Sequence, residues 1–181
     1  MTTDPRRART EQKLRFARLH LDELSGMPSP GRGHDFERAH QEAVLAQLMG
    51  AYHSFLQELN VILECGRRDD DVSLGKLRDA LRERGRSSGV LRRLYELQQD
   101  EGRWLRQLQA LRDSATHISG IPLVFYAGGE DDGKVALKHP RTMVEFPDTA
   151  VDTLTTWLES MRGLFAELRE LAKAESEQPG R

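Results

Sequence analysis

Hydrophobic side chains recur at helical spacing through most of this 181-residue chain. Apolar positions three and four residues apart lie on one face of a helix, so each such stretch predicts a helix with one buried side. The pattern predicts five helices, over residues 10–24, 35–64, 74–84, 89–117 and 148–173. Thr10, Asp35 and Asp148 are the expected caps of the first, second and last of these helices.

The second predicted helix is apolar over more than half of its circumference. Its hydrophobic stripe runs from Phe36 to Ile62 without a breaker other than Gly50, and Val44 and Leu45 broaden it. A helix with so wide an apolar surface usually lies in the centre of a bundle. We therefore expect a central position for it, and its width also favours self-association.

The pattern changes from helical to extended after residue 120. The run IPLVFYA (121–127) is β-branched and aromatic, GGEDDG (128–133) is a turn cluster, and KVALK (134–138) is a second short extended run. These features predict a β-hairpin, and its extension by residues 142–146 is left open. An isolated hairpin is marginal in water, so this one must pack on the bundle or on a partner.

Together these elements predict a mainly α fold. We expect an up-and-down bundle of about five helices, with one β-hairpin (121–139) inserted before the last helix. The length suits one domain, placed at residues 10–173, with disordered ends at 1–9 and 174–181.

The charge balance excludes a simple electrostatic function. The formal net charge is −2, which gives no global case for binding nucleic acid or membranes. The distribution is uneven, because residues 66–112 hold twelve Lys or Arg against eight Asp or Glu, and the following residues hold seven against twelve. Solvated helix faces explain this pattern, and a basic ligand-facing surface is the alternative.

Cysteine usage and hydropathy indicate a cytoplasmic protein. The single Cys65 ends an apolar run, which predicts a buried structural thiol and fits a reducing compartment. The N-terminal residues lack the apolar region of a signal peptide, and no apolar stretch approaches the roughly 20 residues that span a bilayer. We therefore expect no membrane association.

Arg112, Asp113 and His117 form the strongest candidate for chemistry. They lie where a predicted helix ends, close to Gly120 and Pro122. If the last helical turn is loosened, Arg112 and His117 can converge, with the arginine on a phosphate and the histidine moving a proton. Asp113 could orient either group. The alternative is structural: Arg112 pairs with a carboxylate, and His117 caps free carbonyls at the helix end.

The run from Trp104 to His117 resembles the R-x4-6-H motif of the HEPN superfamily (higher eukaryotes and prokaryotes nucleotide-binding). Asp113 matches the polar residue that commonly follows the motif arginine. The resemblance implies a helical bundle that dimerises and binds RNA or nucleotides. In nuclease members, paired motifs form a metal-independent RNase site, so it also implies catalytic Arg112, Asp113 and His117. A second likeness, over roughly the first sixty residues, is to uncharacterised short bacterial helical proteins.

The remaining histidines and glycines predict neither a metal site nor a cofactor site. His40 and His53 are thirteen residues apart and lie on different sides of their helix, and no HExxH motif occurs. His53, between Tyr52 and Phe55, is expected in the core, whereas His20 and His34 are expected at the surface. The glycines of residues 128–133 are accompanied by acidic residues, which repel phosphate.

Three function classes compete. The first is a HEPN-like nucleotide- or RNA-binding module, or a metal-independent RNase, acting as a homodimer. The second is a non-catalytic helical interaction or dimerisation protein in which Arg112 and His117 are structural. The third is a helix-turn-helix DNA-binding factor built from residues 74–84 and 89–117, against which the acidic residues and near-neutral charge argue.

Overall fold

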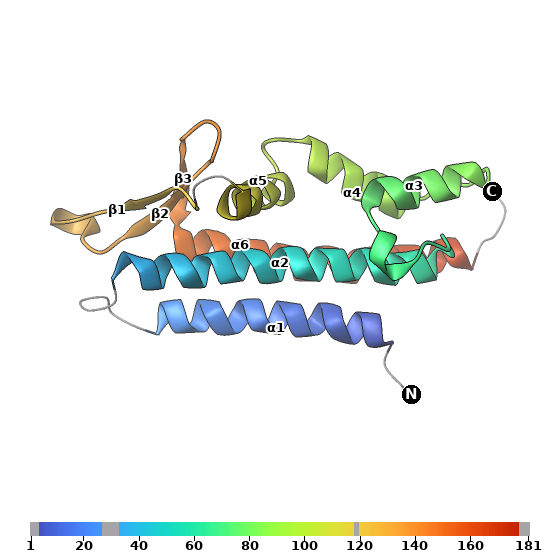
Figure 1. Ribbon diagram of the computed structural model, residues 1–181, viewed down its shortest axis with the longest axis horizontal. Helices are drawn as coiled ribbons and strands as arrows, with labels where there is room; N and C mark the ends of the chain where they lie inside the picture. Colours follow the sequence, from blue (N-terminus) through green and yellow to red (C-terminus); the bar gives the residue numbers. More distant parts are fainter. Residues whose placement is uncertain (1–3, 27–32, 118–119, 178–181) are drawn as a thin grey trace.

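Three long helices run side by side along the length of the molecule (Figure 1). The computed structural model describes residues 4–26, 33–117 and 120–177, with His117 described by its backbone alone. These helices are α1 (Pro5–Ser25), α2 (His34–Ile62) and α6 (Ala150–Ser176). The expected central position of the second helix is confirmed, because α2 contacts α1, α5 and α6.

Shorter helices cover the side of α2 and α6 that faces away from α1 (Figure 1). They are the 3-10 turn η1 (Asp69–Asp71), α3 (Leu74–Glu83), α4 (Gly89–Gln99) and α5 (Trp104–His117). The described residues thus form six α-helices, because the expected 89–117 helix is two helices.

The break between α4 and α5 is built by an aspartate. The Asp100 carboxylate accepts hydrogen bonds from the Gly102 backbone N–H (2.9 Å) and from Arg103 Nε (3.1 Å). A short side chain that binds the backbone two residues on stabilises a turn instead of a helix. The expectation of one continuous helix is therefore wrong, and α5 lies across the long helices, seen nearly end-on in Figure 1.

The first helix begins five residues before the expected start. Asp4 is its cap, with Oδ1 accepting from the Arg6 backbone N–H (3.0 Å), and Pro5 occupies the first turn, where its missing N–H costs nothing. Thr10 is buried inside the helix, and its hydroxyl donates to the Arg6 carbonyl (3.2 Å). The expected cap at Thr10 is wrong because Asp4 satisfies the helix start earlier.

Two further caps differ from expectation. Asp35 lies in the first turn of α2, which begins after Gly33, so it favours the helix by its charge and not as the cap. Asp148 lies in a strand, and Thr149 caps α6 by accepting a hydrogen bond from the Asp152 N–H (3.1 Å). The physical reason is that the strand continues through Asp148 before the chain turns into the helix.

A three-stranded antiparallel sheet precedes the last helix, which confirms the predicted hairpin. The strands are β1 (Leu123–Phe125), β2 (Val135–Lys138) and β3 (Glu145–Thr149), in the order β1-β2-β3. Leu123 pairs with Leu137 in the hairpin. β3 begins only at Glu145, because Met143 adopts a left-handed conformation (φ 58°) in the turn before it.

The sheet packs on the bundle, as a marginal hairpin requires. Ala136 and Leu137 of β2 are buried. Phe146 of β3 meets the edge of the Trp157 ring of α6, with ring centroids 5.6 Å apart.

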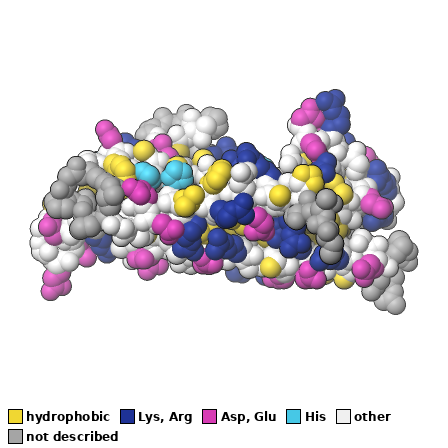
Figure 2. Space-filling view, turned by 90° about the horizontal axis from the view of Figure 1, so that it is seen from below, with side chains coloured by type: hydrophobic (Ala, Val, Ile, Leu, Met, Phe, Trp, Pro, Cys, Tyr) yellow, Lys and Arg dark blue, Asp and Glu magenta, His cyan; other side chains and the backbone are white. Residues whose placement is uncertain are grey.

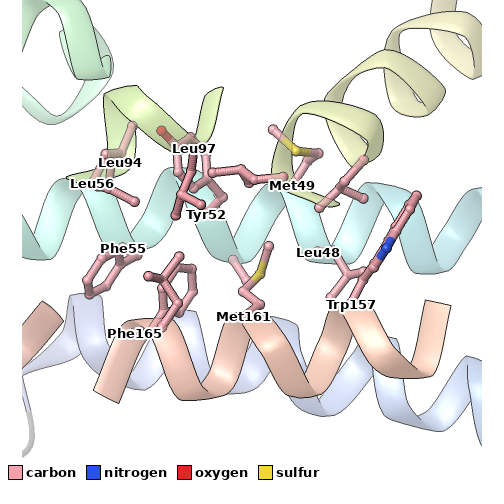
Figure 3. Packing of buried hydrophobic residues seen from close by; sticks show 14 of the residues in the cluster. Leu48, Met49, Tyr52, Phe55, Leu56, Leu94, Leu97, Trp157, Met161 and Phe165 are labelled. Carbon is pink, nitrogen blue, oxygen red and sulfur yellow. The ribbon is translucent and has the colours of Figure 1, made fainter. Parts of the chain in front are cut away.

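The core extends from the buried face of α1, across α2 and α6, to the covering helices. Figure 3 shows Phe55 of α2 and Phe165 of α6 facing each other, and their stacked rings have centroids 4.1 Å apart. Leu94 and Leu97 of α4 close the core from the other side (Figure 3). Cys65 is buried, which confirms the predicted structural thiol. The predicted mainly α fold with a β-hairpin before the last helix is confirmed.

Among the residues that the structure describes, no helix combines the length and the apolar character needed to cross a bilayer.

Candidate functional site

Arg112 lies in the third turn of α5, directly after the buried Leu111. Its side chain is 29% exposed, and Nη1 lies 3.3 Å from Oδ1 of Asp113. The Nε atom is buried and has no hydrogen-bond partner within the described residues. A buried donor without an acceptor costs about 1–3 kcal/mol. Part of the hydrogen-bonding capacity of Arg112 is therefore unused within the described residues.

His117 is the last residue of α5, and its side chain lies outside the described residues. The helical backbone continues to this position, and the Thr116 hydroxyl donates to the Arg112 carbonyl one turn earlier (2.9 Å). Positions five residues apart on a regular helix point about 140° apart. The structure thus brings Arg112 and Asp113 together, but the backbone does not bend to bring position 117 toward Arg112.

Arg112 lines a polar cleft of about 270 Å³, which we call the Arg112 cleft. Its walls come from α2, the start of α3, α4 and α5. The lining residues are Met49, Tyr52, His53, Leu56, Val72, Ser73, Leu74, Gly75, Gln98, Gln109, Arg112 and Asp113. Four consecutive helices thus meet around one arginine.

A histidine does stand beside Arg112, and it is His53 of α2. The residue is exposed, so the prediction that it lies in the core is wrong. Partial burial of the ring and the nearby positive charge of Arg112 lower the pKa of His53 below its ordinary value. The imidazole is therefore neutral at neutral pH, and it can accept or donate a hydrogen bond to a ligand in the cleft.

Helical geometry explains why His53 differs from its neighbours. Position 53 lies about 100° around the helix from Tyr52 and about 200° from Phe55. Tyr52 and Phe55 are both buried. His53 therefore points away from the side on which α6 packs, into the space that α3 and α5 leave open. The exposure of His53 therefore depends on where α3 and α5 lie, which the periodicity of α2 does not specify.

The floor and rim of the cleft are fixed by hydrogen bonds. Gln98 Nε2 of α4 donates to the Tyr52 hydroxyl (2.7 Å). Burial raises the pKa of Tyr52, so its phenol stays protonated and orients its neighbours without exchanging protons near neutral pH. At the rim, Ser73 Oγ accepts from the Lys76 backbone N–H (3.3 Å) and caps α3.

This arrangement can bind an anion and exchange a proton with it. A guanidinium matches the oxygens of a phosphate, and a neutral imidazole beside it can take or give a proton. Asp113 competes for Arg112, so a ligand must replace that exposed ion pair. Such pairs contribute about 0–1 kcal/mol to stability, so a ligand that replaces Asp113 loses little free energy.

The other histidines make separate contacts. His20 of α1 and His40 of α2 face each other with their Nδ1 atoms 3.2 Å apart, so His20 is not simply exposed, as was expected. His34 is exposed and stacks on Phe125 of β1 at a centroid distance of 3.7 Å. Within residues 4–26, 33–117 and 120–177, no three His, Cys, Asp or Glu side chains are grouped to hold a metal ion.

The fold and the cleft define a class of protein: a helical bundle with a small sheet at one end and a polar, arginine-lined cleft between its covering helices. A family model described as a family of unknown function (DUF6586) matches residues 1–175, so the chain belongs to that family. No curated protein and no solved structure matches the chain.

Proposed function

We propose that this protein is a HEPN-like nucleotide- or RNA-binding module that holds a phosphate group of its ligand in the Arg112 cleft. The observation that supports the proposal most directly is the placement of Arg112 and His53 in the walls of one cleft. The sequence led us to expect an arginine and a histidine on one phosphate. In the proposed site, His53 takes the role that was expected of His117. The proposed setting is a cytoplasmic homodimer.

The chemistry favours a phosphoryl group over a carboxylate. The cleft offers guanidinium, imidazole, amide and hydroxyl groups from Arg112, His53, Gln109 and Ser73, and a phosphate can accept from several of these at once. A volume of about 270 Å³ accommodates a phosphate and part of a sugar, so the base would lie outside the cleft.

Titration of a labelled mononucleotide tests the binding function. We expect Arg112→Gln to weaken binding at least tenfold and Arg112→Lys to recover only part of it, because lysine lacks the planar fork of donors. Arg106→Gln is the matched control, because Arg106 is on the same helix and pairs with Glu101 (3.0 Å) outside the cleft. Equal affinities for wild type and Arg112→Gln would remove the cleft from any binding function.

Cleavage of RNA in the presence of a chelator tests the catalytic version of the proposal. If His53 transfers the proton, His53→Ala lowers the rate by about 10²- to 10⁴-fold, and His117→Ala leaves it unchanged. If the HEPN-like arrangement holds, the loss follows His117→Ala instead. Chelator-resistant cleavage that survives both substitutions belongs to a contaminant and leaves only the binding function.

A non-catalytic interaction protein is the second candidate, and a different surface favours it. Met143 and Val144, in the turn between β2 and β3, are 54% and 66% exposed. They adjoin a hollow of about 520 Å³ that Val144 and Phe146 line together with Glu101 and Gln107 of the α4–α5 region. The ion pair of Arg112 with Asp113 also fits this function.

Light scattering combined with nucleotide binding tests whether this turn is a dimer interface. If the turn is an interface between copies of this chain, Val144→Asp converts a dimer to a monomer and leaves nucleotide binding intact. A wild-type monomer that binds nucleotide contradicts self-association through this turn, as well as the proposed homodimer.

A further inference from the structure

One strongly basic segment of the chain lines a groove. Residues 76–93 carry seven Lys or Arg against two Asp or Glu. They form α3, the turn after it and the first turn of α4. Arg78, Arg82, Arg86 and Arg92, with Asp79, line a groove of about 450 Å³ between these helices, here called the α3–α4 groove.

Much of this positive charge has no partner. Asp79 pairs with Arg82 (2.8 Å), but Arg86 and Arg92 form no ion pair within the described residues. Both are exposed. Three guanidinium groups of the groove therefore remain available for anions: those of Arg78, Arg86 and Arg92.

One of these arginines is stacked on an aromatic ring. The Arg78 guanidinium lies 3.8 Å from the centre of the Tyr95 ring, which belongs to α4 and is exposed. A guanidinium held over a ring keeps its N–H groups at the edge, directed outward, and offers a flat surface for a base. This pairing suits a ligand with both phosphates and bases.

The groove is adjacent to the Arg112 cleft. Gly75, in the first turn of α3, lines both hollows. A Cβ added at Gly75 would meet nothing within 4 Å, so no side chain separates them there. An extended ligand can therefore pass from Arg112 over Gly75 to Arg78, Arg86 and Arg92.

We infer that the Arg112 cleft and the α3–α4 groove together bind one single-stranded nucleic acid, with one phosphate at Arg112 and the following phosphates at Arg78, Arg86 and Arg92. This inference rests on the proposed function and names its ligand as an oligonucleotide instead of a mononucleotide. Successive phosphates on arginines account for the uneven charge of a chain whose net charge is only −2.

The shape of the surface favours a single strand over the other anionic partners. A duplex is read by a convex helix that enters its major groove, whereas these arginines line a concave groove. An anionic membrane would require apolar side chains beside the basic ones, and Tyr95 is the only exposed large hydrophobic residue of α3 and α4.

Binding of a series of single-stranded oligonucleotides, from two to twelve nucleotides, tests the inference. The variant is Arg86→Ala/Arg92→Ala. Its matched control is Arg7→Ala/Arg15→Ala, which removes the same charge from exposed arginines of α1 on the opposite side of the molecule (Figure 1). We expect affinity to rise with length in the wild type, and the groove variant to lose at least tenfold for the longest strand.

The salt dependence sharpens the test. Each phosphate contact contributes about 0.7 to the slope of log affinity against log salt for a single strand, so losing two contacts should make the slope shallower by about 1.4. The control should change the affinity less than twofold. Equal losses in both variants, an unchanged slope, or tighter binding of duplex DNA or anionic vesicles would overturn the inference.

Failure of the inference is distinguishable from failure of the proposed function. If mononucleotide binding depends on Arg112 but strands bind no more tightly than a mononucleotide, the cleft functions alone and the inference is wrong. If strands bind through Arg86 and Arg92 with no effect of Arg112→Gln, the groove does not lead to the cleft and the inference is wrong, whereas the proposed function is decided by the mononucleotide titration.

Discussion

At the residue scale, a buried ion pair between Arg169 and Glu58 lies inside the helical bundle. Arg169 of α6 donates to both oxygens of Glu58 of α2, at 2.9 and 3.0 Å, and its Nη1 donates to Glu11 of α1 at 2.9 Å. The side chains of Arg169 and Glu58 are only 8% and 2% exposed. Arg169, Glu58 and Glu11 form a triad that joins the three long helices at one point. Removing one carboxylate leaves the buried guanidinium with fewer partners.

Glu58→Leu should therefore destabilise the protein by about 3 kcal/mol, because it leaves a buried guanidinium with one partner. The double variant Glu58→Leu/Arg169→Met should recover most of that loss, since apolar side chains can replace a buried ion pair. Urea unfolding measures both. Arg68→Ala, which removes an exposed ion pair with Asp70, is the control and should change the free energy of unfolding by less than about 1 kcal/mol. A small effect of Glu58→Leu would contradict the role of the triad.

Histidine ionisation makes stability depend on pH at the same scale. Burial and the neighbouring His40 lower the pKa of His20, and burial and Arg112 lower the pKa of His53. The unfolded chain protonates its histidines near pH 6.5. The folded state takes up these protons only at lower pH, so stability is highest above that value and falls as the pH drops through it.

The measurement is the free energy of unfolding at pH 8 and pH 5. The carboxylates of the protein add their own pH dependence, so the decisive quantity is the difference between wild type and His20→Gln. The variant should lose less stability between the two pH values. A larger loss in the variant would mean that protonated His20 stabilises the α1–α2 contact.

Residue identity alone predicted part of the candidate site. Arg112 and Asp113 stand out in the sequence because an arginine and an acid precede a histidine near a helix end. His53 could not be found in this way, because a helical position specifies an angle around its own axis and not what other helices cover. The cleft around it depends on residues from 49 to 113.

At the scale of elements, a carboxylate from one helix caps another. Glu175 near the end of α6 accepts hydrogen bonds from the Gly89 N–H (2.8 Å), the Val90 N–H (3.3 Å) and the Ser88 hydroxyl (2.6 Å). These are the unpaired donors at the start of α4, where a negative charge is favourable. The contact fixes α4, and with it one wall of the α3–α4 groove, to the end of α6.

Glu175→Gln should lower the free energy of unfolding by about 1–2 kcal/mol, since a neutral amide makes weaker hydrogen bonds to a helix start than a carboxylate does. Thermal unfolding followed by circular dichroism measures the change. Glu170→Gln on the same helix is the control, because its exposed pair with Lys173 should contribute little. Equal changes in the free energy of unfolding for the two substitutions would show that the Glu175 cap stabilises the protein no more than an exposed ion pair does.

The types of element were predictable, and several of their ends were not. Periodicity identified α2, α3 and α6 and the change to strands after residue 120. The break before Trp104 was missed because Gly102 alone only weakens a helix, whereas the Asp100 side chain stabilises the turn. The start of α1 was missed because the Arg-rich residues 6–9 precede the apolar stripe of the helix, which begins later.

At the scale of the whole molecule, basic residues gather both on α1 and around the α3–α4 groove. The side that α1 forms mixes cationic and anionic side chains, with histidines gathered at one place (Figure 2). The α3–α4 side concentrates arginines around one groove next to the Arg112 cleft. The formal net charge of −2 conceals these local concentrations of basic residues.

The four walls of the Arg112 cleft come from elements that meet only in the folded bundle, so ligand binding and folding should be linked.

The most direct test of a phosphate site in the Arg112 cleft is the NMR titration of the His53 ring in the presence and absence of a saturating 5′-mononucleotide. We predict that the bound phosphate raises the pKa of His53, because a nearby negative charge favours the protonated ring. Arg112→Gln should also raise this pKa without ligand, because it removes the neighbouring positive charge, and should abolish the response to the nucleotide. A His53 pKa that is the same with and without nucleotide, at concentrations that saturate any binding, would contradict a phosphate site in the Arg112 cleft.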